Sequence, residues 1–265
     1  MFDLNGTKKI VIKVGSSLII NEDGGHLVIN SEWLKTLASD VIYLRKSGID
    51  VIVVSSGAIA FAKSILYPNF IPKNSDLTVA KKQSLAAFGQ VKLMNLYSEI
   101  FAAHNINVAQ ILMTAHDNKD QNSRSNIQAA ISELIASDMI PIINENDVVA
   151  TDEIKIGDND TLSAIVSATV GADSLFLLSD IDGLYDKNPH LNSDAILIRE
   201  VRDIDQSILN IAGDSLSSVG TGGMRTKVLA AQIAKQANCK TIIISGKHNN
   251  PIRQFLNTHT GTVFY

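Results

Sequence analysis

Short runs of apolar residues alternate with longer amphipathic segments along most of this chain. The runs are rich in β-branched residues and almost continuously hydrophobic, which is typical of strands buried on both faces of a parallel sheet. Six strands are predicted in this way, at residues 10–14, 51–54, 109–112, 140–143, 174–178 and 241–244.

The segments between the predicted strands carry apolar residues at helical spacing. One helix is predicted around Trp33 to Leu44, with Ser31 as its N-cap and Gly48 ending it. Others are predicted at 76–103 (one long helix or two abutting helices), 124–137, 160–170 and 224–237. This alternation predicts an α/β fold, a three-layer αβα sandwich with a mainly parallel central sheet. No repeat or proline-rich linker interrupts the chain, so residues 1–265 are predicted to form a single domain.

Composition narrows the class of protein. With 265 residues, 45% of them hydrophobic and 19% charged, the chain can bury a full core. The net charge of -4 argues against a nucleic-acid-binding protein, which needs a basic face. The single cysteine, Cys239, suits a reducing compartment and is expected to pack at the start of a strand. No signal peptide or membrane-spanning run is found, so we expect a cytoplasmic protein with no membrane partner.

Two dense polar clusters follow the fourth predicted strand. Residues 144–147 read Asn-Glu-Asn-Asp, and residues 157–160 read Gly-Asp-Asn-Asp. Each buried polar group without a partner costs about 1–3 kcal/mol, so these clusters indicate a binding site for a ligand rich in donors and charge. Asp147 would hold a ligand ammonium, and Asn144 would pair with either end of an amino acid. The alternatives are an asparagine-rich turn and, for the second cluster, the acidic first turn of a helix.

A glycine-rich loop precedes the last long helix. Residues 220–223 read Gly-Thr-Gly-Gly, and a helix is predicted to start at once. Arg225 and Lys227 then place positive charge in the first helical turn, where the helix dipole disfavours it by roughly 0.3–1 kcal/mol. A bound polyanion would reverse that sign, although the spacing is not that of a Walker A loop. The alternative is a flexible loop with solvated basic residues.

Three other strand ends carry candidate residues. Lys13 lies near the end of the first strand, two residues before Gly15. Residues 56–58 (Ser-Gly-Ala) follow the second strand and open a helix whose N–H groups can bind a carboxylate or phosphate. Ser179 and Asp180 end another strand, in position to contact a nucleotide. The alternatives are a solvated lysine at residue 13, an N-cap serine before the helix at residues 56–58, and a simple turn at residues 179–180.

The chain resembles the amino acid kinase family over essentially its whole length. The resemblance rests on these motifs and their order: Lys13-Val14-Gly15-Ser16, Ser56-Gly57-Ala58, the two polar clusters, and Gly220-Thr221-Gly222-Gly223-Met224. The clusters at 144–147 and 157–160 resemble most specifically the members that phosphorylate glutamate. The resemblance implies transfer of a phosphoryl group from ATP, with Mg²⁺, to the γ-carboxylate of L-glutamate. The product would be glutamyl 5-phosphate, the start of proline biosynthesis.

The resemblance also implies a role for each matching residue. The catalytic residues would be Lys13, Asp160 and Lys227, and no side chain is assigned to a metal. The substrate site would comprise Ser56, Gly57, Ala58, Asn144, Asp147 and Asn159. The nucleotide site would comprise Lys13, Ser179, Asp180, Thr221, Gly222, Gly223, Met224, Arg225, Thr226 and Lys227. The N-terminal part would mainly bind substrate, and residues from about 170 to 265 would mainly bind nucleotide.

The resemblance further implies a homo-oligomer and feedback inhibition by proline. Two departures from the family pattern are expected to matter. Arg225 stands where a small residue is more familiar, which would change local nucleotide contacts. The chain stops at Tyr265, without the C-terminal RNA-binding-like module of the PUA type that many bacterial members carry.

Two alternatives of function stay open. One is a kinase of the same fold that acts on aspartate, acetylglutamate, carbamate or a nucleoside monophosphate. The other is a nucleotide sensor without catalysis, against which the presence of Lys13, Lys227 and Asp160 argues. For glutamate itself, the γ-carboxylate is already ionised at neutral pH, so we expect catalysis by charge neutralisation rather than by a general base. The sequence therefore predicts that the amines of Lys13 and Lys227 lie together, oriented by Asp160.

Overall fold

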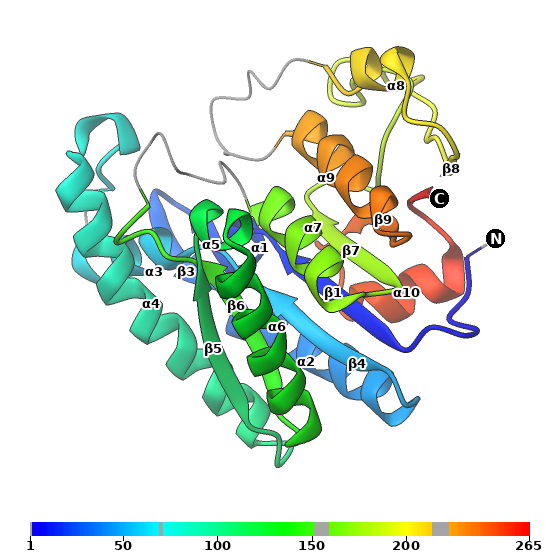
Figure 1. Ribbon diagram of the computed structural model, residues 1–265. Helices are drawn as coiled ribbons and strands as arrows, with labels where there is room; N and C mark the ends of the chain where they lie inside the picture. The colour runs from blue at the N-terminus through cyan, green and yellow to red at the C-terminus, as the bar shows by residue number, and fades with distance from the viewer. Residues whose placement is uncertain (1, 69–70, 151–158, 214–222) are drawn as a thin grey trace.

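A sheet of eight strands runs through the centre of the computed structural model, which describes residues 2–68, 71–150, 159–213 and 223–265 (Figure 1). Neighbouring strands are parallel except that β10 is antiparallel to β9. The strand order is β5 (Val108–Met113), β6 (Ile140–Glu145), β4 (Asp50–Val54), β1 (Lys9–Val14), β7 (Ser174–Ser179), β9 (Lys240–Ser245), β10 (Thr262–Phe264) and β8 (Glu200–Val201). The predicted mainly parallel sheet is confirmed, with all six predicted strands in it.

Helices cover both faces of this sheet (Figure 1). On one face lie α2 (Ser31–Lys46), α4 (Val79–Ala102) and α10 (Pro251–Thr258), which share one buried apolar cluster. On the other face lie α6 (Gln121–Ala136), α7 (Asn159–Val170) and α9 (Met224–Gln236), which share a second cluster. The predicted three-layer αβα sandwich is therefore confirmed.

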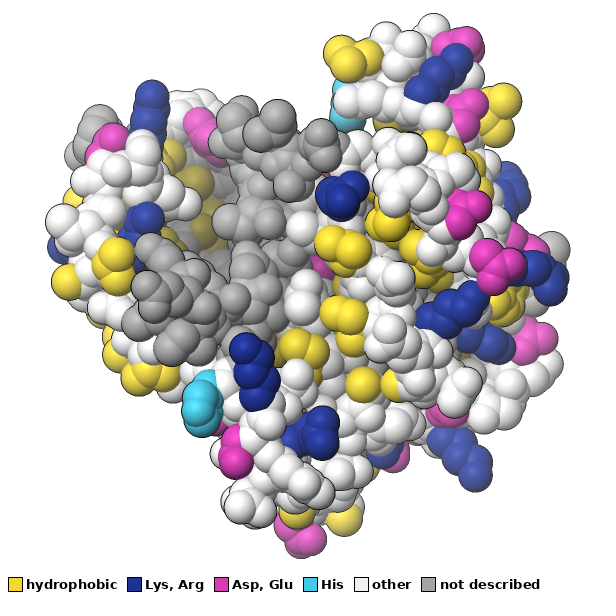
Figure 2. Space-filling model, turned by 45° about the horizontal axis from the view of Figure 1, so that its top comes forward, with side chains coloured by type: hydrophobic (Ala, Val, Ile, Leu, Met, Phe, Trp, Pro, Cys, Tyr) yellow, Lys and Arg dark blue, Asp and Glu magenta, His cyan; other side chains and the backbone are white. Residues whose placement is uncertain are grey.

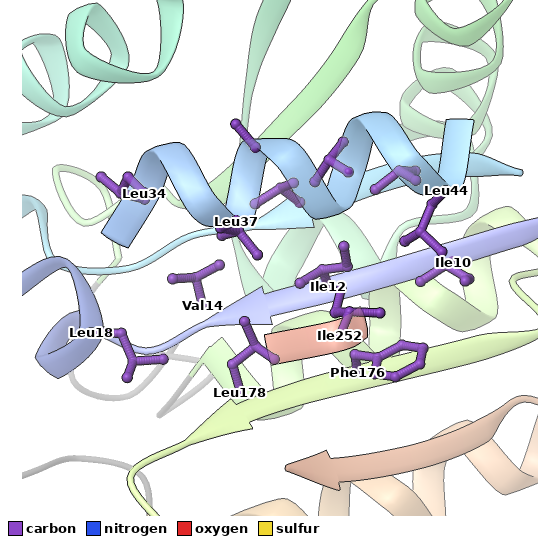
Figure 3. Close-up of a cluster of buried hydrophobic side chains, with 14 of the residues drawn as sticks. Ile10, Ile12, Val14, Leu18, Leu34, Leu37, Leu44, Phe176, Leu178 and Ile252 are labelled. Atoms are coloured by element: carbon purple, nitrogen blue, oxygen red, sulfur yellow. The ribbon is translucent and has the colours of Figure 1, made fainter. Parts of the chain in front are cut away.

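The alternation of side chains along β1 joins the two clusters. Ile10, Ile12 and Val14 point to the first cluster, and Val11 belongs to the second. Figure 3 shows the first cluster, in which side chains of α2 lie against β1 and β7. A strand that is apolar on both faces can lie only in the middle of a covered sheet, which places the end of β1 at the centre of the molecule.

The shorter elements were not predicted from the sequence, apart from α3. They are α1 (Ser16–Ile19), the hairpin of β2 (Ile20–Asp23) and β3 (His26–Ile29), α3 (Ala58–Leu66), the 3₁₀ turn η1 (Asn74–Asp76), α5 (Ala115–Lys119) and α8 (Gln206–Ile211). Strands of two to four residues carry too few apolar positions to show a period. The start of α3 was predicted from its small residues and does begin at Ala58.

The N-cap predicted for α2 was wrong by one residue. The cap is Asn30, whose side-chain oxygen accepts a hydrogen bond from the backbone N–H of Trp33 at 3.4 Å. Its amide also donates to the carbonyl of Leu18 at 3.3 Å. At the other end, Gly48 adopts the left-handed conformation (φ 77°) that ends the helix as predicted. Residues 79–102 form one continuous helix, α4, rather than two.

The parallel strands β1, β4, β6, β7 and β9 all end at the same edge of the sheet. Lys13 lies beside Val54 on one side and beside Leu177 on the other, so the loops that follow β1, β4 and β7 are neighbours. Seen partly from this direction, the surface has Lys and Arg side chains interspersed with Asp and Glu side chains (Figure 2). Within the described ranges, none of the helices is both long and apolar enough to cross a membrane.

Candidate active site

Two lysines from opposite ends of the chain bind one buried carboxylate. Lys13 Nζ lies 2.5 Å from Asp160 Oδ1, and Lys227 Nζ lies 2.9 Å from Asp160 Oδ2. Lys13 is the last residue but one of β1, Asp160 lies in the first turn of α7, and Lys227 lies in the first turn of α9. The predicted proximity of the two amines is therefore present in the structure. We call these three residues the Lys–Asp–Lys trio.

The trio is almost completely removed from solvent. The exposed fraction is 7% for Lys13, 0% for Asp160 and 5% for Lys227. Burial acts to raise the pKa of Asp160, but the charges of Lys13 and Lys227 outweigh it and lower that pKa from 3.8 to about 2. The carboxylate is therefore ionised at neutral pH. The trio itself carries two cationic groups and one carboxylate in a poorly solvated site, an arrangement that suits an incoming anion.

Besides the two lysines, a residue in the first turn of α9 also binds the carboxylate of Asp160. Thr226 donates a hydrogen bond from Oγ1 to Asp160 Oδ2 at 3.0 Å, and it lies 2.8 Å from the carbonyl oxygen of Gly223. Gly223 is the N-cap of α9, and Met224 is the first helical residue. Arg225 Nη1 contacts the carbonyl of Leu209 in α8 at 3.5 Å. Thr221 and Gly222 of the predicted nucleotide site lie outside the described residues, as do Gly157 and Asp158 of the second polar cluster.

The predicted substrate residues gather at the ends of β4 and β6. Asn144 is buried at the end of β6, and its side-chain oxygen accepts a hydrogen bond from Asn159 Nδ2 at 2.8 Å. Ser56 donates to the carbonyl of Val14 at 2.9 Å, which ties the turn after β4 to the end of β1. The next residue, Gly57, has φ 100° and caps α3, a conformation that favours glycine. Asn159 precedes Asp160 in α7, so the substrate residues join the trio directly.

The remaining predicted residues lie at the same edge of the sheet. Ser179 ends β7, and its hydroxyl contacts Asp180 Oδ1 at 3.2 Å. Asp147 lies in the turn after β6 and is partly buried, as is Asn146 before it. Ala58 is buried as the first residue of α3. Parallel pairing places Ser179 one residue beyond the partner of Val14.

Three buried polar residues of this region were missed from the sequence: Gln90, Ser55 and Tyr97. Gln90 accepts a hydrogen bond from Asn144 Nδ2 at 2.8 Å, and Ser55 Oγ lies 3.0 Å from the hydroxyl of Tyr97. Gln90 occupies the apolar stripe of α4, at helical spacing with Leu93 and Tyr97. A glutamine in such a stripe was the available signal, because a lone buried amide needs a partner.

The described residues offer no group of three or more His, Cys, Asp or Glu side chains that could hold a metal ion. They do offer a cationic, water-poor site next to a helix N-terminus, which fits an anionic ligand. The described residues therefore have the chemistry to bind phosphoryl groups.

Comparison with known proteins assigns the family. A model of the amino acid kinase family matches residues 8–245, which is most of the chain. The chain belongs to the amino acid kinase family. Solved structures show the same fold, among them UMP kinase from Ureaplasma parvum (TM-score 0.66, 16% identity, 97% of this chain and 98% of that one). Carbamate kinase from Giardia lamblia bound to AMP-PNP is another (TM-score 0.64, 18% identity, 98% of each chain).

Proteins more similar in sequence than these solved structures include several named glutamate 5-kinase. The glutamate 5-kinase of Roseobacter denitrificans is 42% identical over 92% of this chain and 64% of its own length. That of Pelagibacter ubique is 44% identical over 98% of this chain and 69% of its own length. The chain thus spans about two thirds of the length of these relatives.

Proposed function

We propose that this chain transfers the γ-phosphoryl group of ATP to the γ-carboxylate of L-glutamate, giving ADP and glutamyl 5-phosphate. The observation that carries the proposal is the Lys–Asp–Lys trio, in which two buried ammonium groups share one carboxylate. The sequence relatives named glutamate 5-kinase supply the choice of glutamate.

The chemical difficulty of the reaction is electrostatic. The γ-carboxylate of glutamate has an ordinary pKa near 4.3, so it is ionised and nucleophilic at neutral pH without a base. One of its oxygens attacks the γ-phosphorus, and the bond from that phosphorus to the β–γ bridging oxygen breaks to release ADP. Both reactants are anions, so the barrier falls when positive charge is placed between them.

The trio supplies this positive charge in a fixed geometry. Lys13 would bind the phosphoryl group from the side of β1, and Lys227 from the side of α9. Asp160 accepts no proton in this scheme, because both its oxygens already bind ammonium groups. It positions the two amines before substrate arrives, so that they need no reorganisation during transfer.

For glutamate, we propose a site formed by Asn144, Asp147 and Asn159 together with the N-terminus of α3 at residues 56–58. The carboxylate of Asp147 and the carbonyl oxygen of Asn159 suit the α-ammonium group, and Asn144 orients Asn159 by accepting a hydrogen bond from it. The N–H groups of residues 56–58 suit a carboxylate, because helix N-termini carry unsatisfied donors and positive dipole ends. The N-terminal part of the single domain would thus mainly bind substrate.

For the nucleotide, we propose the start of α9 from Gly223 to Lys227, preceded by Thr221 and Gly222, together with Ser179 and Asp180 after β7. The residues from about 170 onward would thus mainly bind ATP. Mg²⁺ would enter as part of the substrate Mg·ATP, held by phosphate oxygens. Entry into proline biosynthesis, assembly into a homo-oligomer and inhibition by proline remain predictions of the resemblance.

The test is a substrate panel with Mg·ATP and hydroxylamine. Hydroxylamine traps an acyl phosphate as a hydroxamate, so the γ-carboxylate product can be counted alongside ADP. We expect glutamate to give equal amounts of ADP and hydroxamate, and aspartate and UMP to give little of either. Preferential phosphorylation of UMP or aspartate would contradict the choice of substrate. ATP binding without glutamate-dependent ADP release would contradict catalysis altogether.

A further inference from the structure

A chain of buried and partly buried hydrogen bonds runs from α4 to the proposed glutamate site. Gln90 Oε1 accepts from Asn144 Nδ2 at 2.8 Å, and Asn144 Oδ1 accepts from Asn159 Nδ2 at 2.8 Å. Asn159 Nδ2 also donates to the carbonyl of Ser55 at 2.5 Å. Four elements take part: α4, β6, α7 and the end of β4.

The chemistry of the partners fixes the direction of each amide. Asn144 Oδ1 accepts from the backbone N–H of Glu145 at 2.9 Å, and a backbone N–H can only donate. The oxygen end of Asn144 must therefore face Glu145 and Asn159, and its nitrogen must face Gln90. Asn159 Nδ2 meets two oxygens, so both its hydrogens are used within the protein. The carbonyl oxygen of Asn159 is the end that can accept from a ligand.

Close packing of α4 on α3 brings Gln90 to this position. The preceding residue is Gly89, and a Cβ atom there would lie 1.8 Å from the backbone oxygen of Ala58, the first residue of α3. Only a glycine allows α4 to approach so closely. Gln90 itself is 9% exposed and Asn144 is 3% exposed, so water has little access to replace their hydrogen bond.

We propose that Gln90 is a positioning residue that sets the affinity for glutamate, a proposal that rests on the function proposed above. By accepting from Asn144, Gln90 holds the carboxamide of Asn144 in one orientation. That orientation presents an acceptor to Asn159, which in turn presents its own carbonyl oxygen to the substrate ammonium. Without Gln90, a buried Asn144 N–H would lack its partner, and reversing the amide to find another would break the contact with Asn159.

The test compares two substitutions that separate hydrogen bonding from packing. Gln90→Met keeps the length and apolar volume but removes the carbonyl acceptor, and we expect the glutamate KM to rise about 10-fold or more. The ATP KM and kcat should stay within about threefold of wild type, because no contact in the chain of hydrogen bonds reaches the nucleotide side. Gln90→Glu keeps an acceptor for Asn144 and should give a glutamate KM closer to that of wild type.

A purely structural role predicts the opposite order, since methionine suits a buried position better than a carboxylate. A glutamate KM that is normal in Gln90→Met and raised in Gln90→Glu would therefore overturn the proposal. Should Gln90→Met not fold, Gln90→Glu decides alone: a KM within about threefold of wild type supports the role, and a larger rise opposes it. Gln128→Met, on the exposed side of α6, is the matched control and should change neither KM.

Assay of the wild-type protein distinguishes failure of the role proposed for Gln90 from failure of the proposed glutamate kinase activity. A wild-type protein that shows no glutamate-dependent ADP release overturns both. A wild-type protein that phosphorylates glutamate, together with an unchanged glutamate KM in Gln90→Met, overturns the role of Gln90 and leaves the function standing.

Discussion

Asp160 has no solvent exposure and yet carries a charge. Removing a carboxylate from water costs several kcal/mol, and the structure offsets that cost with Lys13 on one oxygen and Lys227 on the other. The same arrangement brings two buried lysines onto one carboxylate. Asp160 is thus both a structural residue and the residue that prepares the site for an anion.

Replacement of Asp160 should therefore destabilise the fold. Asp160→Asn removes the negative charge that two buried ammonium groups share, and we expect the free energy of unfolding at pH 7 to fall by about 3–5 kcal/mol. Urea denaturation measures this change. Asp138→Asn is the matched control, because Asp138 is exposed and pairs with Arg45 at the surface, and it should cost less than about 1 kcal/mol. Equal losses in the two variants would contradict the pairing described for Asp160.

The stabilisation by Asp160 should also depend on pH in one direction. Its pKa is lowered from 3.8 to about 2 in the folded protein, so the ionised form contributes stability above roughly pH 4 and loses that contribution as pH falls toward 2. The difference in unfolding free energy between wild type and Asp160→Asn should stay constant from about pH 7 to 5 and shrink by about 1–2 kcal/mol by about pH 3. A difference that grew on acidification would contradict the lowered pKa.

At the scale of elements, the contact between α3 and α4 controls the proposed substrate site. Gly89 lets the backbone of α4 lie against Ala58, the first residue of α3. The next residue of α4, Gln90, accepts a hydrogen bond from Asn144. A shift of α4 would therefore move Gln90 relative to Asn144, whereas the residues of the trio lie on β1, α7 and α9.

Gly89→Ala tests this contact. In an isolated helix the change should stabilise by about 1 kcal/mol, because alanine is the better helix former. Here the new methyl group would lie 1.8 Å from a backbone oxygen that cannot rotate away, so overpacking should dominate and cost about 1–3 kcal/mol in urea denaturation. We also expect a higher glutamate KM with a nearly unchanged ATP KM. Ser84→Ala, on the exposed side of α4, should leave stability and both KM values near those of wild type.

A more stable Gly89→Ala protein would show that α3 and α4 separate easily, and it would remove the structural reason for the glycine. An ATP KM that rises as much as the glutamate KM would show that the change spreads beyond the substrate side. Either result would contradict the separation of the two halves of the site.

At the scale of the whole molecule, the sequence predicted the long elements and the edge of the sheet that carries function. Five of the six predicted strands are apolar and buried on both faces, and this property can be seen without any knowledge of their partners. The sixth, β5, was predicted to be buried as well but lies at the edge of the sheet and is partly exposed. β8, β10 and the β2–β3 hairpin were missed because elements of two to four residues owe their form to neighbours distant in the chain. The cap of α2 was missed by one residue for the same reason, since Asn30 also binds Leu18.

The site shows a similar division. Lys13, Asp160 and Lys227 were expected together through a resemblance that covers the whole chain. Lys13 lies 147 residues before Asp160, and Lys227 lies 67 residues after it. The fold brings the three together through the parallel order of β1, β7 and β9. Gln90 was not predicted, because its partner lies 54 residues away and a glutamine in a helix has no motif of its own. Long-range hydrogen bonds of this kind become visible only when the elements are packed.

The most direct test of the central claim is the kcat for glutamate in Lys13→Met, Lys227→Met and the double variant, each at saturating glutamate and Mg·ATP. Methionine keeps the buried stem and removes the charge, and Lys35→Met on the exposed face of α2 is the control. We predict that each single change at the trio lowers kcat by about 100- to 1,000-fold. We also predict that the double change costs less than the product of the two, because both amines act on one phosphoryl group. Near wild-type turnover in either single variant would contradict the claim that two lysines on one carboxylate neutralise the transfer.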